Sequence, residues 1–366
     1  MITSTKSDLP LLQKYIKYLE RIWETRWMTN DGEFVQSFEN KLREYLGVKD
    51  LVAVSNGTSA LQIALKVLNI RGEIITTPFT FAATTNVILW EGLTPVFSDI
   101  DPETFNINPD DVERKITDDT SAILAVHVYG NPCDVEKLQD IADKHNLELI
   151  HDAAHAFSVE YNDQPIVKYG DLSILSFHAT KVFHTIEGGA IISNRDGLLD
   201  KLKLLRNHGI KSEEEVIIPG INAKMNEFQA VMGLCNLEDI DEKIELRRKI
   251  HEYYKEKLKD LPVKFQRLTA SKCNYSYMPV CFKDMEHRDA IYFELLKNGI
   301  RSRKYFYPLT VNYDYFKKKG VDLVEKYGLK NAFDISNRVL CLPLYPDLEI
   351  QEVDRVISII EKIIKT

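Results

Sequence analysis

The sequence predicts an α/β fold in which a central, mostly parallel sheet is flanked by helices and followed by a smaller C-terminal α/β domain. From about residue 50, short β-branched apolar runs alternate with amphipathic segments, which is typical of parallel strands joined by helical crossovers. A length of 366 residues suits about two domains. No linker rich in Gly, Pro and Ser separates them, so we expect the two domains, residues 1–240 and 241–366, to pack closely.

The elements of the first domain follow from their length and from the turn residues between them. Short β-branched runs predict strands at 51–55, 73–77, 94–99, 122–128, 147–152, 172–177 and 189–193. Amphipathic segments predict helices at 58–68, 82–90, 109–115 and 135–145. The third helix begins at Asn108-Pro109, a capping side chain followed by proline at the first helical position. Ligands of such sheets bind beyond the carboxyl ends of the strands, so we expect the chemistry there.

A long charged helical stretch, 226–261, is predicted to connect the two domains. Strand and helix patterns return after it, at 277–282, 287–298, 323–330 and 351–365. This mixture predicts a second α/β unit.

The composition argues against several classes of protein. Apolar residues make up 44% and charged residues 28%, as in an ordinary soluble globular enzyme. The net charge of -8 repels a phosphate backbone, so we expect no nucleic acid as a partner. No apolar run reaches the roughly 18 residues that span a bilayer, and the N-terminus lacks a signal-peptide pattern, so we expect a cytoplasmic protein outside the membrane. The five cysteines are an odd number without a C-x-x-C pair, which argues against a disulfide framework and against a metal site.

The segment SNGTSALQIAL, 55–65, is the first candidate for a binding site. A strand ends, Gly57 turns the chain, and a helix begins at Thr58 and Ser59. Free backbone N–H groups and the positive end of the helix dipole can hold a phosphate there. The alternative is a helix start that Ser or Thr merely caps.

The segment HDAAHAF, 151–157, directly follows the strand at 147–152. A carboxylate such as Asp152 is costly to leave unpaired among apolar residues, and a protonated ring nitrogen is a suitable partner. Such a carboxylate keeps a pyridinium charged, so that the ring can accept electrons. Alternatively, Asp152 caps the following turn, and His151 and His155 are surface or satisfied core residues.

The segment SFHATKVFHTIEGGA, 176–190, contains the third candidate, Lys181. Apolar and hydroxyl side chains surround this lysine, and poor solvation favours the neutral amine that attacks a carbonyl. Gly188-Gly189 lets the backbone fold close to it, and Ser176 can face the same phosphate. A lone lysine is usually a solvated charge. Here a phosphate-type turn, a strand-end Asp and a lysine occur in one chain, in that order, and the combination favours a site.

These motifs resemble those of the DegT-type family of nucleotide-sugar aminotransferases, which depend on pyridoxal 5′-phosphate (PLP). The similarity covers nearly the whole chain, from 27–48 through the three segments above to 219–237 and to RKYFYPL and LPLYP near the end. It implies the aspartate-aminotransferase fold (PLP fold type I).

The resemblance also implies roles for single residues. Lys181 would bind PLP covalently and later move a proton, and Asp152 would pair with the pyridine nitrogen. Phe81 would stack on the ring, and His155 would lie near its hydroxyl group. The phosphate would be held by Gly57, Thr58, Ser59, Ser176 and, from a neighbouring subunit, Asn222. A shared site of this kind implies a homodimer.

Two histidines depart from the family's usual pattern. His151 stands where an acidic residue is usual, and it should point away from the ring because neighbours on a strand alternate faces. His184 stands where close relatives often have Asn, within reach of a substrate at Lys181. Relatives in which histidine replaces the lysine dehydrate sugars, but this chain keeps Lys181, which favours transamination.

The subgroup with SFHATKVF, GIN-x-KM and KYFYPL aminates dTDP-4-keto-6-deoxyglucose, with L-glutamate as the usual donor, for surface polysaccharides. The residues that we expect to contact the substrate are Thr29, Asn30, His178, His184, Arg303, Lys304 and Tyr305, with Arg26 and Tyr307 as further candidates. Arg303, Lys304 and Arg26 could bind its pyrophosphate or be surface charges. The alternatives are amination at C3 of a 3-keto sugar, a regulatory protein that kept the PLP fold but lost catalysis, and another type I PLP enzyme such as a lyase.

Overall fold

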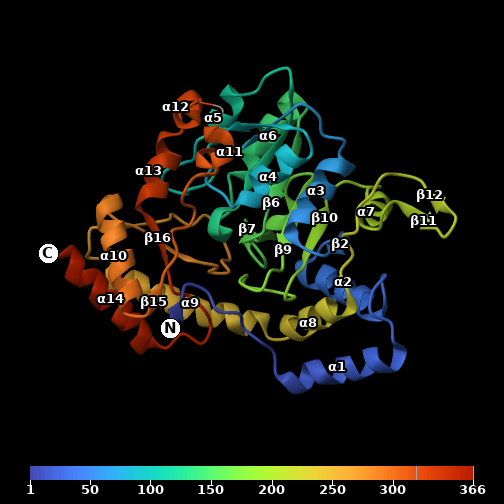
Figure 1. The fold of residues 1–366 in the computed structure, drawn as a ribbon, viewed down its shortest axis with the longest axis horizontal. Coiled ribbons are helices and arrows are strands. Elements are labelled where there is room, and N and C mark those ends of the chain that lie inside the picture. The colour runs from blue at the N-terminus through green and yellow to red at the C-terminus, as the bar shows by residue number, and fades with distance from the viewer. Residues whose placement is uncertain (319, 366) are drawn as a thin grey trace.

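The computed structural model describes residues 1–318 and 320–365, and it confirms the α/β fold. A seven-stranded sheet with the order β2-β10-β9-β6-β5-β3-β4 forms the centre of the larger part of the molecule (Figure 1). Its strands are β2 (Asp50–Val54), β3 (Glu73–Thr76), β4 (Thr94–Phe97), β5 (Thr120–Val126), β6 (Glu148–Asp152), β9 (Leu172–Ser176) and β10 (Gly189–Ser193). Every expected strand of the first domain is present, with ends that differ by one or two residues.

One strand runs against the others. β3, β4, β5, β6 and β9 pair in parallel, whereas β10 is antiparallel to both β2 and β9. The connection from β9 to β10 contains no helix, and an antiparallel pair does not need one. Gly189, the first residue of β10, therefore lies opposite Ser176, the last residue of β9. The loop between them, 177–188, stays at the edge where the parallel strands end.

Helices cover both faces of this sheet (Figure 1). In β2, Leu51 and Ala53 belong to one core cluster, and Val52 and Val54 belong to the other, because alternate residues of a strand face opposite sides. The first cluster contains residues of α2 (Glu33–Leu46), α5 (Pro109–Arg114), α6 (Val135–His145) and α8 (Glu227–Leu237). The second contains residues of α3 (Gly57–Val67), α4 (Ala82–Trp90) and α7 (Leu199–Arg206).

The charged helical stretch expected over 226–261 is present, but it is broken into two helices. The chain forms α8, which ends at Leu237, and then α9 (Ile240–Leu258), because Asp239 leaves the helical conformation with φ -113° and ψ 6°. Most residues of α8 are buried, whereas α9 is rich in charged residues and a smaller share of its side chains is buried. The two helices thus pack in different environments, and the break lets each present its own apolar face.

The C-terminal part has a core of its own. β14 (Met278–Cys281) lies between β13 (Lys264–Phe265) and β16 (Val339–Leu342), and α10 (Met285–Lys297) and α14 (Ile350–Ile364) pack with them. This core also contains Ile2, because β1 (Ile2–Thr3) pairs with β15 (Ile300–Arg301). The division of the chain into residues 1–240 and 241–366 stays a prediction, although Ile2 packs in the core of the second part.

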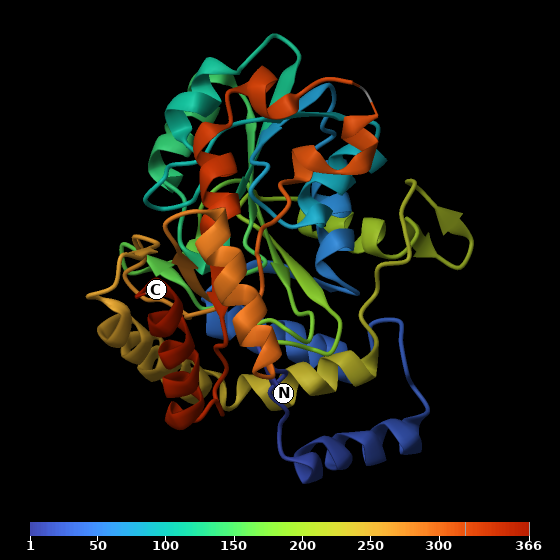
Figure 2. The same cartoon turned by 60° about the vertical axis from the view of Figure 1, so that its left-hand side comes forward.

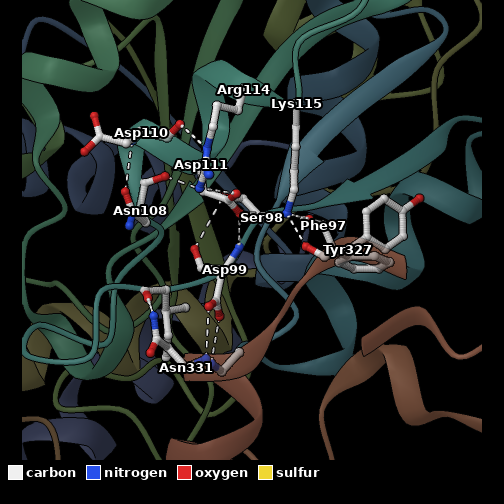
Figure 3. Close-up of polar contacts among 12 residues, drawn as sticks. Phe97, Ser98, Asp99, Asn108, Asp110, Asp111, Arg114, Lys115, Tyr327 and Asn331 are labelled. Atoms are coloured by element: carbon white, nitrogen blue, oxygen red, sulfur yellow. Dashed lines mark hydrogen bonds and ion pairs between the residues drawn. The ribbon is translucent and has the colours of Figure 1, made fainter. Parts of the chain in front are cut away.

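The element predicted at 323–330 is present as a shorter helix, and a further helix that the sequence did not predict follows it. α12 (Leu323–Tyr327) ends at Gly328, whose φ of 64° stops the helix, and α13 (Lys330–Arg338) begins two residues later. Asp99, just after β4, accepts hydrogen bonds from the backbone N–H groups of Asn331 (3.0 Å) and Ala332 (2.8 Å), at the start of α13 (Figure 3). These contacts fix α13 to the edge of the central sheet.

The N-terminal helix α1 (Leu12–Thr25) lies apart from the layers of the sheet, at the periphery of the molecule (Figure 2). The small hairpin of β11 (Ile210–Ser212) and β12 (Glu215–Val216) also projects outward (Figure 1). Across the described residues, no helix combines the length and the apolar character that crossing a membrane requires.

Candidate active site

A cavity of about 690 Å³ opens beyond the carboxyl ends of the parallel strands, where the sequence places the chemistry. Its wall contains residues that directly follow β2, β6 and β9 and residues of the loop before β10. Lys181, Asp152 and Ser59 all line it, although they are far apart in the sequence. The fold therefore brings the three candidate segments into one site.

The turn from β2 into α3 forms one end of the cavity. Asn56 caps α3 by accepting a hydrogen bond of 2.8 Å from the N–H group of Ser59. The N–H groups of Gly57 and Thr58 have no partner within residues 1–318 and 320–365. A Cβ atom at Gly57 would lie 2.9 Å from the Cβ atom of Ser176, so only glycine lets the helix start approach Ser176 so closely. Free N–H groups, a helix N-terminus and hydroxyl groups together suit a phosphate.

Asp152 is buried at the end of β6, with 5% of its surface exposed. Its Oδ2 atom accepts a hydrogen bond of 2.8 Å from the hydroxyl group of Thr84, and its Oδ1 atom accepts one of 3.1 Å from the N–H group of Ala154. Burial raises the pKa of this carboxyl group, and the described part of the chain places no cation in an ion pair with it. One oxygen thus caps the turn, as the alternative interpretation expected, and the carboxylate still lacks a cationic partner.

Lys181 lies in the loop at 177–188, and its side chain faces the cavity. The loop turns tightly here, because the N–H group of Lys181 donates a hydrogen bond of 2.9 Å to the carbonyl oxygen of His178. Burial lowers the pKa of the amine, the charge of Asp152 opposes this, and the charge of Arg303 adds to it, so that the pKa is about 8. A lysine with this pKa is partly neutral near pH 7, as a nucleophile or base must be.

His155 is part of a buried aromatic cluster beside Lys181. Its Nδ1 atom accepts a hydrogen bond of 3.3 Å from the N–H group of Tyr129, and its Nε2 atom lies 3.4 Å from the hydroxyl oxygen of Tyr305. Burial lowers the pKa of the ring well below its ordinary value. The ring is therefore neutral, and its remaining proton is on Nε2. Phe81, at the start of α4, also lines the cavity and exposes 51% of its surface, so its ring is available for stacking.

These residues fit the cofactor that the resemblance implies. PLP carries a phosphate, a pyridine nitrogen that needs an anionic partner, and an aldehyde that an amine can attack. The N-terminus of α3 with Ser176, the buried carboxylate of Asp152 and the amine of Lys181 match these three groups in one cavity. Their roles in this chain stay predictions.

The structure places His184 outside the cavity. His184 is 3% exposed, and its Nε2 atom lies 2.5 Å from the carbonyl oxygen of Asp8. The side-chain amide of Asn236 donates a hydrogen bond of 2.9 Å to the carbonyl oxygen of His184. The Nδ1 atom accepts from the N–H group of Ile186 at 3.3 Å. His184 thus fastens the lysine loop to the N-terminal segment, and a direct contact with substrate is not supported.

Other expected substrate residues also lie apart from the cavity. Lys304 forms an ion pair with Asp289, and the guanidinium group of Arg288 covers the ring of Tyr307 at 4.7 Å. Arg26, Thr29 and Asn30 are exposed after α1. In contrast, His178, Arg303 and Tyr305 do line the cavity.

Asn222 lines the cavity of its own chain and is exposed to solvent. The expectation that it reaches the phosphate of a neighbouring subunit stays a prediction. His151 points away from the cavity, as expected, and stacks on His127 with ring centroids 4.7 Å apart.

The sequence reasoning missed Asn56, Thr84 and Thr180. Asn56 could have been found, since Asn is among the preferred residues before a helix. Thr84 could also have been found, because it follows Phe81 by three residues and so lies on the same face of α4. Thr180 donates or accepts a hydrogen bond of 2.8 Å with Nδ1 of His178 in an irregular loop, and no periodicity indicates that contact.

Comparisons with known proteins identify the family of the chain. Residues 11–361 match the profile described as the DegT/DnrJ/EryC1/StrS aminotransferase family. The chain is 42% identical over 363 residues to a dTDP-4-amino-4,6-dideoxy-D-glucose transaminase of Shigella dysenteriae, covering 98% of each chain. Among solved structures, DesI in the presence of its TDP-sugar product superposes with a TM-score of 0.91 at 32% identity, covering 99% of this chain and 92% of that one. NtdA from Bacillus subtilis with bound cofactor PMP superposes with a TM-score of 0.89 at 28% identity, covering 97% and 82%.

Proposed function

The chain belongs to the DegT/DnrJ/EryC1/StrS aminotransferase family, and we propose that it transfers an amino group from L-glutamate to C4 of dTDP-4-keto-6-deoxy-D-glucose. The product would be dTDP-4-amino-4,6-dideoxy-D-glucose, for a surface polysaccharide. The observation that carries the proposal is the meeting of Lys181 and Asp152 in one cavity of a chain that is 42% identical to an enzyme named for this product.

The enzyme is a PLP-dependent aminotransferase. We assign the phosphate of the cofactor to the turn at Gly57–Ser59 and to Ser176, and its ring nitrogen to Asp152. Phe81 would stack on the ring, and the neutral ring of His155 would lie beside it. When bound, PLP supplies a ring that withdraws electrons from the carbon bonded to the substrate nitrogen.

Lys181 then transfers the protons, and Asp152 keeps its charge. The Nζ atom of Lys181, neutral near its pKa of about 8, removes the proton from the α-carbon of glutamate. In the second half of the reaction the same atom supplies a proton to C4 of the sugar. Asp152 stays ionised beside the protonated ring nitrogen, and the hydroxyl group of Thr84 holds it in place. Lys181 must be neutral while Asp152 is ionised, and the lowered pKa of Lys181 makes both states available near neutral pH.

We also propose that two chains form a homodimer. Apolar side chains are exposed around α1, where a single chain leaves them in water: Leu9, Leu11, Leu12, Trp23, Trp27 and Met28. Six exposed large apolar side chains on and beside one helix support a protein–protein contact. Asn222 lines the cavity and is exposed to solvent, where a neighbouring chain can approach. The free cysteines of the chain support a location in the reducing cytoplasm.

The other activities are less well supported. A regulatory protein without catalysis has no need for Lys181 and Asp152 together in a cavity. A C3 aminotransferase would use the same cofactor site, but the relative from Shigella dysenteriae is named for a 4-amino sugar.

The product tests the proposal. The purified protein with PLP, L-glutamate and dTDP-4-keto-6-deoxy-D-glucose should yield 2-oxoglutarate and a sugar whose amino group NMR locates on C4. An amino group on C3, or 2-oxoglutarate formation only with other acceptors, would contradict the substrate assignment. Bleaching of the bound cofactor by glutamate without any sugar product would leave the aminotransferase intact but reject this acceptor.

A further inference from the structure

His184 joins the loop that carries Lys181 to a distant part of the chain. It lies in the loop at 177–188, the lysine loop, and is buried outside the cavity. Burial lowers the pKa of its ring, so the ring is neutral near pH 7. Its Nδ1 atom accepts a hydrogen bond of 3.3 Å from the N–H group of Ile186, which places the single ring proton on Nε2, 2.5 Å from the carbonyl oxygen of Asp8. One nitrogen thus contacts the lysine loop, and the other contacts the N-terminal segment.

The N-terminal segment at 2–8, here called the strap, is held by the C-terminal part of the chain. It begins as β1, which pairs with β15, and the carbonyl oxygen of Ser4 accepts a hydrogen bond of 3.1 Å from the N–H group of Leu344. At its other end, the carboxylate of Asp8 forms an ion pair with Lys243 of α9. Both side chains of this pair are largely buried, so solvent screens it only weakly. The strap therefore connects the C-terminal core to the lysine loop.

The backbone of the lysine loop is strained at Ile186. Its φ of 71° lies in the left-handed region, where a β-branched residue rarely occurs. The side chain is 46% exposed, so burial of the side chain does not compensate for the strain. Two contacts brace the backbone on either side: Nδ1 of His184, and a hydrogen bond of 2.7 Å from the hydroxyl group of Thr185 to the carbonyl oxygen of Glu187. A strained conformation persists only where the surrounding structure holds it in place.

The amine of Lys181 depends on this backbone for its position. Among the described residues, its Nζ atom has no hydrogen-bond or ion-pair partner. The two residues between Lys181 and His184, Val182 and Phe183, are buried, and the ring of Phe183 stacks on Phe157 with centroids 4.3 Å apart. A displacement of His184 would therefore pass through two packed residues to the lysine, since no contact of the amine itself resists it.

We propose that His184 is a positioning residue, which sets the place of the Lys181 amine by fixing the lysine loop to the strap. The inference rests on the proposed role of Lys181, and it gives His184 no contact with substrate or cofactor. Lys181 moves the proton in both half-reactions, so a displaced loop slows both of them and leaves the binding of either substrate nearly unchanged. Through the strap, the C-terminal part of the chain becomes a support of the catalytic lysine.

Three substitutions separate the contacts of the two ring nitrogens. His184→Gln keeps a donor near Nε2 for the carbonyl oxygen of Asp8, His184→Asn keeps an acceptor near Nδ1 for the N–H group of Ile186, and His184→Phe removes both. Hydrogen exchange of the whole protein, followed by mass spectrometry of the peptide that contains 177–188, measures the hold on the loop without turnover. Exchange should be about tenfold faster in His184→Phe, as for the loss of one hydrogen bond, and nearly unaltered in His184→Gln. His184→Asn should lie between them.

The rates of the two half-reactions give a second measurement. With saturating L-glutamate, and separately with saturating keto-sugar, conversion of the bound cofactor should slow about 10- to 100-fold in His184→Phe. The half-maximal concentrations should change less than about threefold. Asp8→Asn weakens the ion pair of the strap with Lys243 and should act in the same direction, adding little to His184→Phe because both act through one contact. His251→Phe is the matched control, a buried histidine of α9 outside the cavity, and should leave exchange of the lysine loop and both rates unchanged.

Several results would overturn the role of His184. A changed half-maximal concentration for one substrate alone would make it a binding residue, and unaltered exchange in His184→Phe would remove its hold on the loop. If His184→Asn matches the unaltered protein and His184→Gln is as impaired as His184→Phe, the strap does not support the lysine. The contrast of Gln with Asn decides this even if His184→Phe fails to fold. If the unaltered protein does not react with glutamate, the proposed function falls, whereas the exchange data still decide whether His184 holds the loop.

Discussion

The hydroxyl group of Thr84 donates a hydrogen bond of 2.8 Å to the carboxylate of Asp152. Both side chains are buried, and Thr84 in turn lies 2.8 Å from the hydroxyl oxygen of Thr80. Helix α4 therefore reaches across to the end of β6 and holds the carboxylate that we assign to the ring nitrogen of PLP. The contact joins the element that carries Phe81 to the element that carries Asp152.

Replacing Thr84 with Val should weaken the cofactor site. The change removes a hydroxyl donor to a buried carboxylate at nearly constant volume, which costs about 1.5–3 kcal/mol for a hydrogen bond to a charged group. PLP affinity and kcat should each fall, by up to about 100-fold together. Thr84→Ser keeps the hydroxyl group and should retain most of both. If Thr84→Val and Thr84→Ser have equal PLP affinity in cofactor titration and equal kcat in steady-state kinetics, this role of Thr84 is rejected.

The uptake of PLP by the cofactor-free protein should depend on pH. Only the neutral amine of Lys181 attacks the aldehyde, and its pKa is lowered to about 8, mainly by burial. The rate of covalent binding, followed by stopped-flow absorbance, should rise about tenfold per pH unit below the midpoint and level off above it. Because Arg303 contributes to the lowering, Arg303→Gln should move the midpoint to higher pH. A rate that is flat from pH 6 to 9 would contradict a titrating lysine.

The stacked pair of His127 and His151 should make the fold sensitive to acid. Burial lowers the pKa of His151 from 6.5 to about 4, so the unfolded chain binds a proton in this range while the folded chain does not. The contribution of His151 to the free energy of unfolding is therefore largest above about pH 6.5, and it is lost as the pH falls toward 4. From pH 7 to 5 this amounts to about 2 kcal/mol for one histidine.

The variant His151→Phe should flatten that dependence. Neither ring nitrogen of His151 has a partner among the described residues, so an apolar ring removes two buried polar atoms. Denaturant unfolding at pH 7 and 5 should show a loss about 2 kcal/mol smaller than in the unaltered protein. His208→Asn, at an exposed site with φ 56°, serves as control. Equal losses in all three proteins would place the acid sensitivity elsewhere.

The capping of α13 by Asp99 should matter for substrate binding. Within α13, the hydroxyl group of Ser336 donates a hydrogen bond of 2.7 Å to the carbonyl oxygen of Phe306, which lines the cavity beside Tyr305. Asp99→Ala removes the acceptor for two N–H groups and should cost about 1–2 kcal/mol of unfolding free energy. KM values should rise more than kcat falls, because the cavity wall shifts while Lys181 and Asp152 stay in place. Asp99→Asn should restore part of the stability and of KM, whereas a loss confined to kcat would contradict a positioning role.

The sequence predicted the residues that follow strands better than those in loops. Asp152 and Ser176 end β6 and β9, and Gly57 lies in the turn that follows β2. Parallel strands end at the same edge, so the meeting of these residues in one cavity could be predicted. The β-branched runs likewise located every strand of the central sheet. Their direction was harder to foresee, because β10 runs antiparallel and its pattern does not differ from that of a parallel strand.

No local sequence pattern predicted the contacts of the loop residues. His184 follows Lys181 by three positions in an irregular loop, and nothing local shows that it turns toward Asp8, 176 residues away. The break between α8 and α9 depends on which face each helix buries, and that is a property of the assembled core. The pairing of Lys304 with Asp289 is likewise a tertiary contact. Such long-range contacts decide which of several basic residues remains free to bind a ligand.

Lys181 as the covalent anchor of PLP is the central claim, and reduction of the holoenzyme tests it directly. Borohydride converts the bond between the cofactor and its lysine into a stable amine, and mass spectrometry of the digested protein locates it. The account predicts a pyridoxyl phosphate group on the peptide that contains Lys181, and no group on any peptide of Lys181→Ala treated in the same way. A modified peptide elsewhere in the chain, or the same modification pattern in Lys181→Ala, would contradict it.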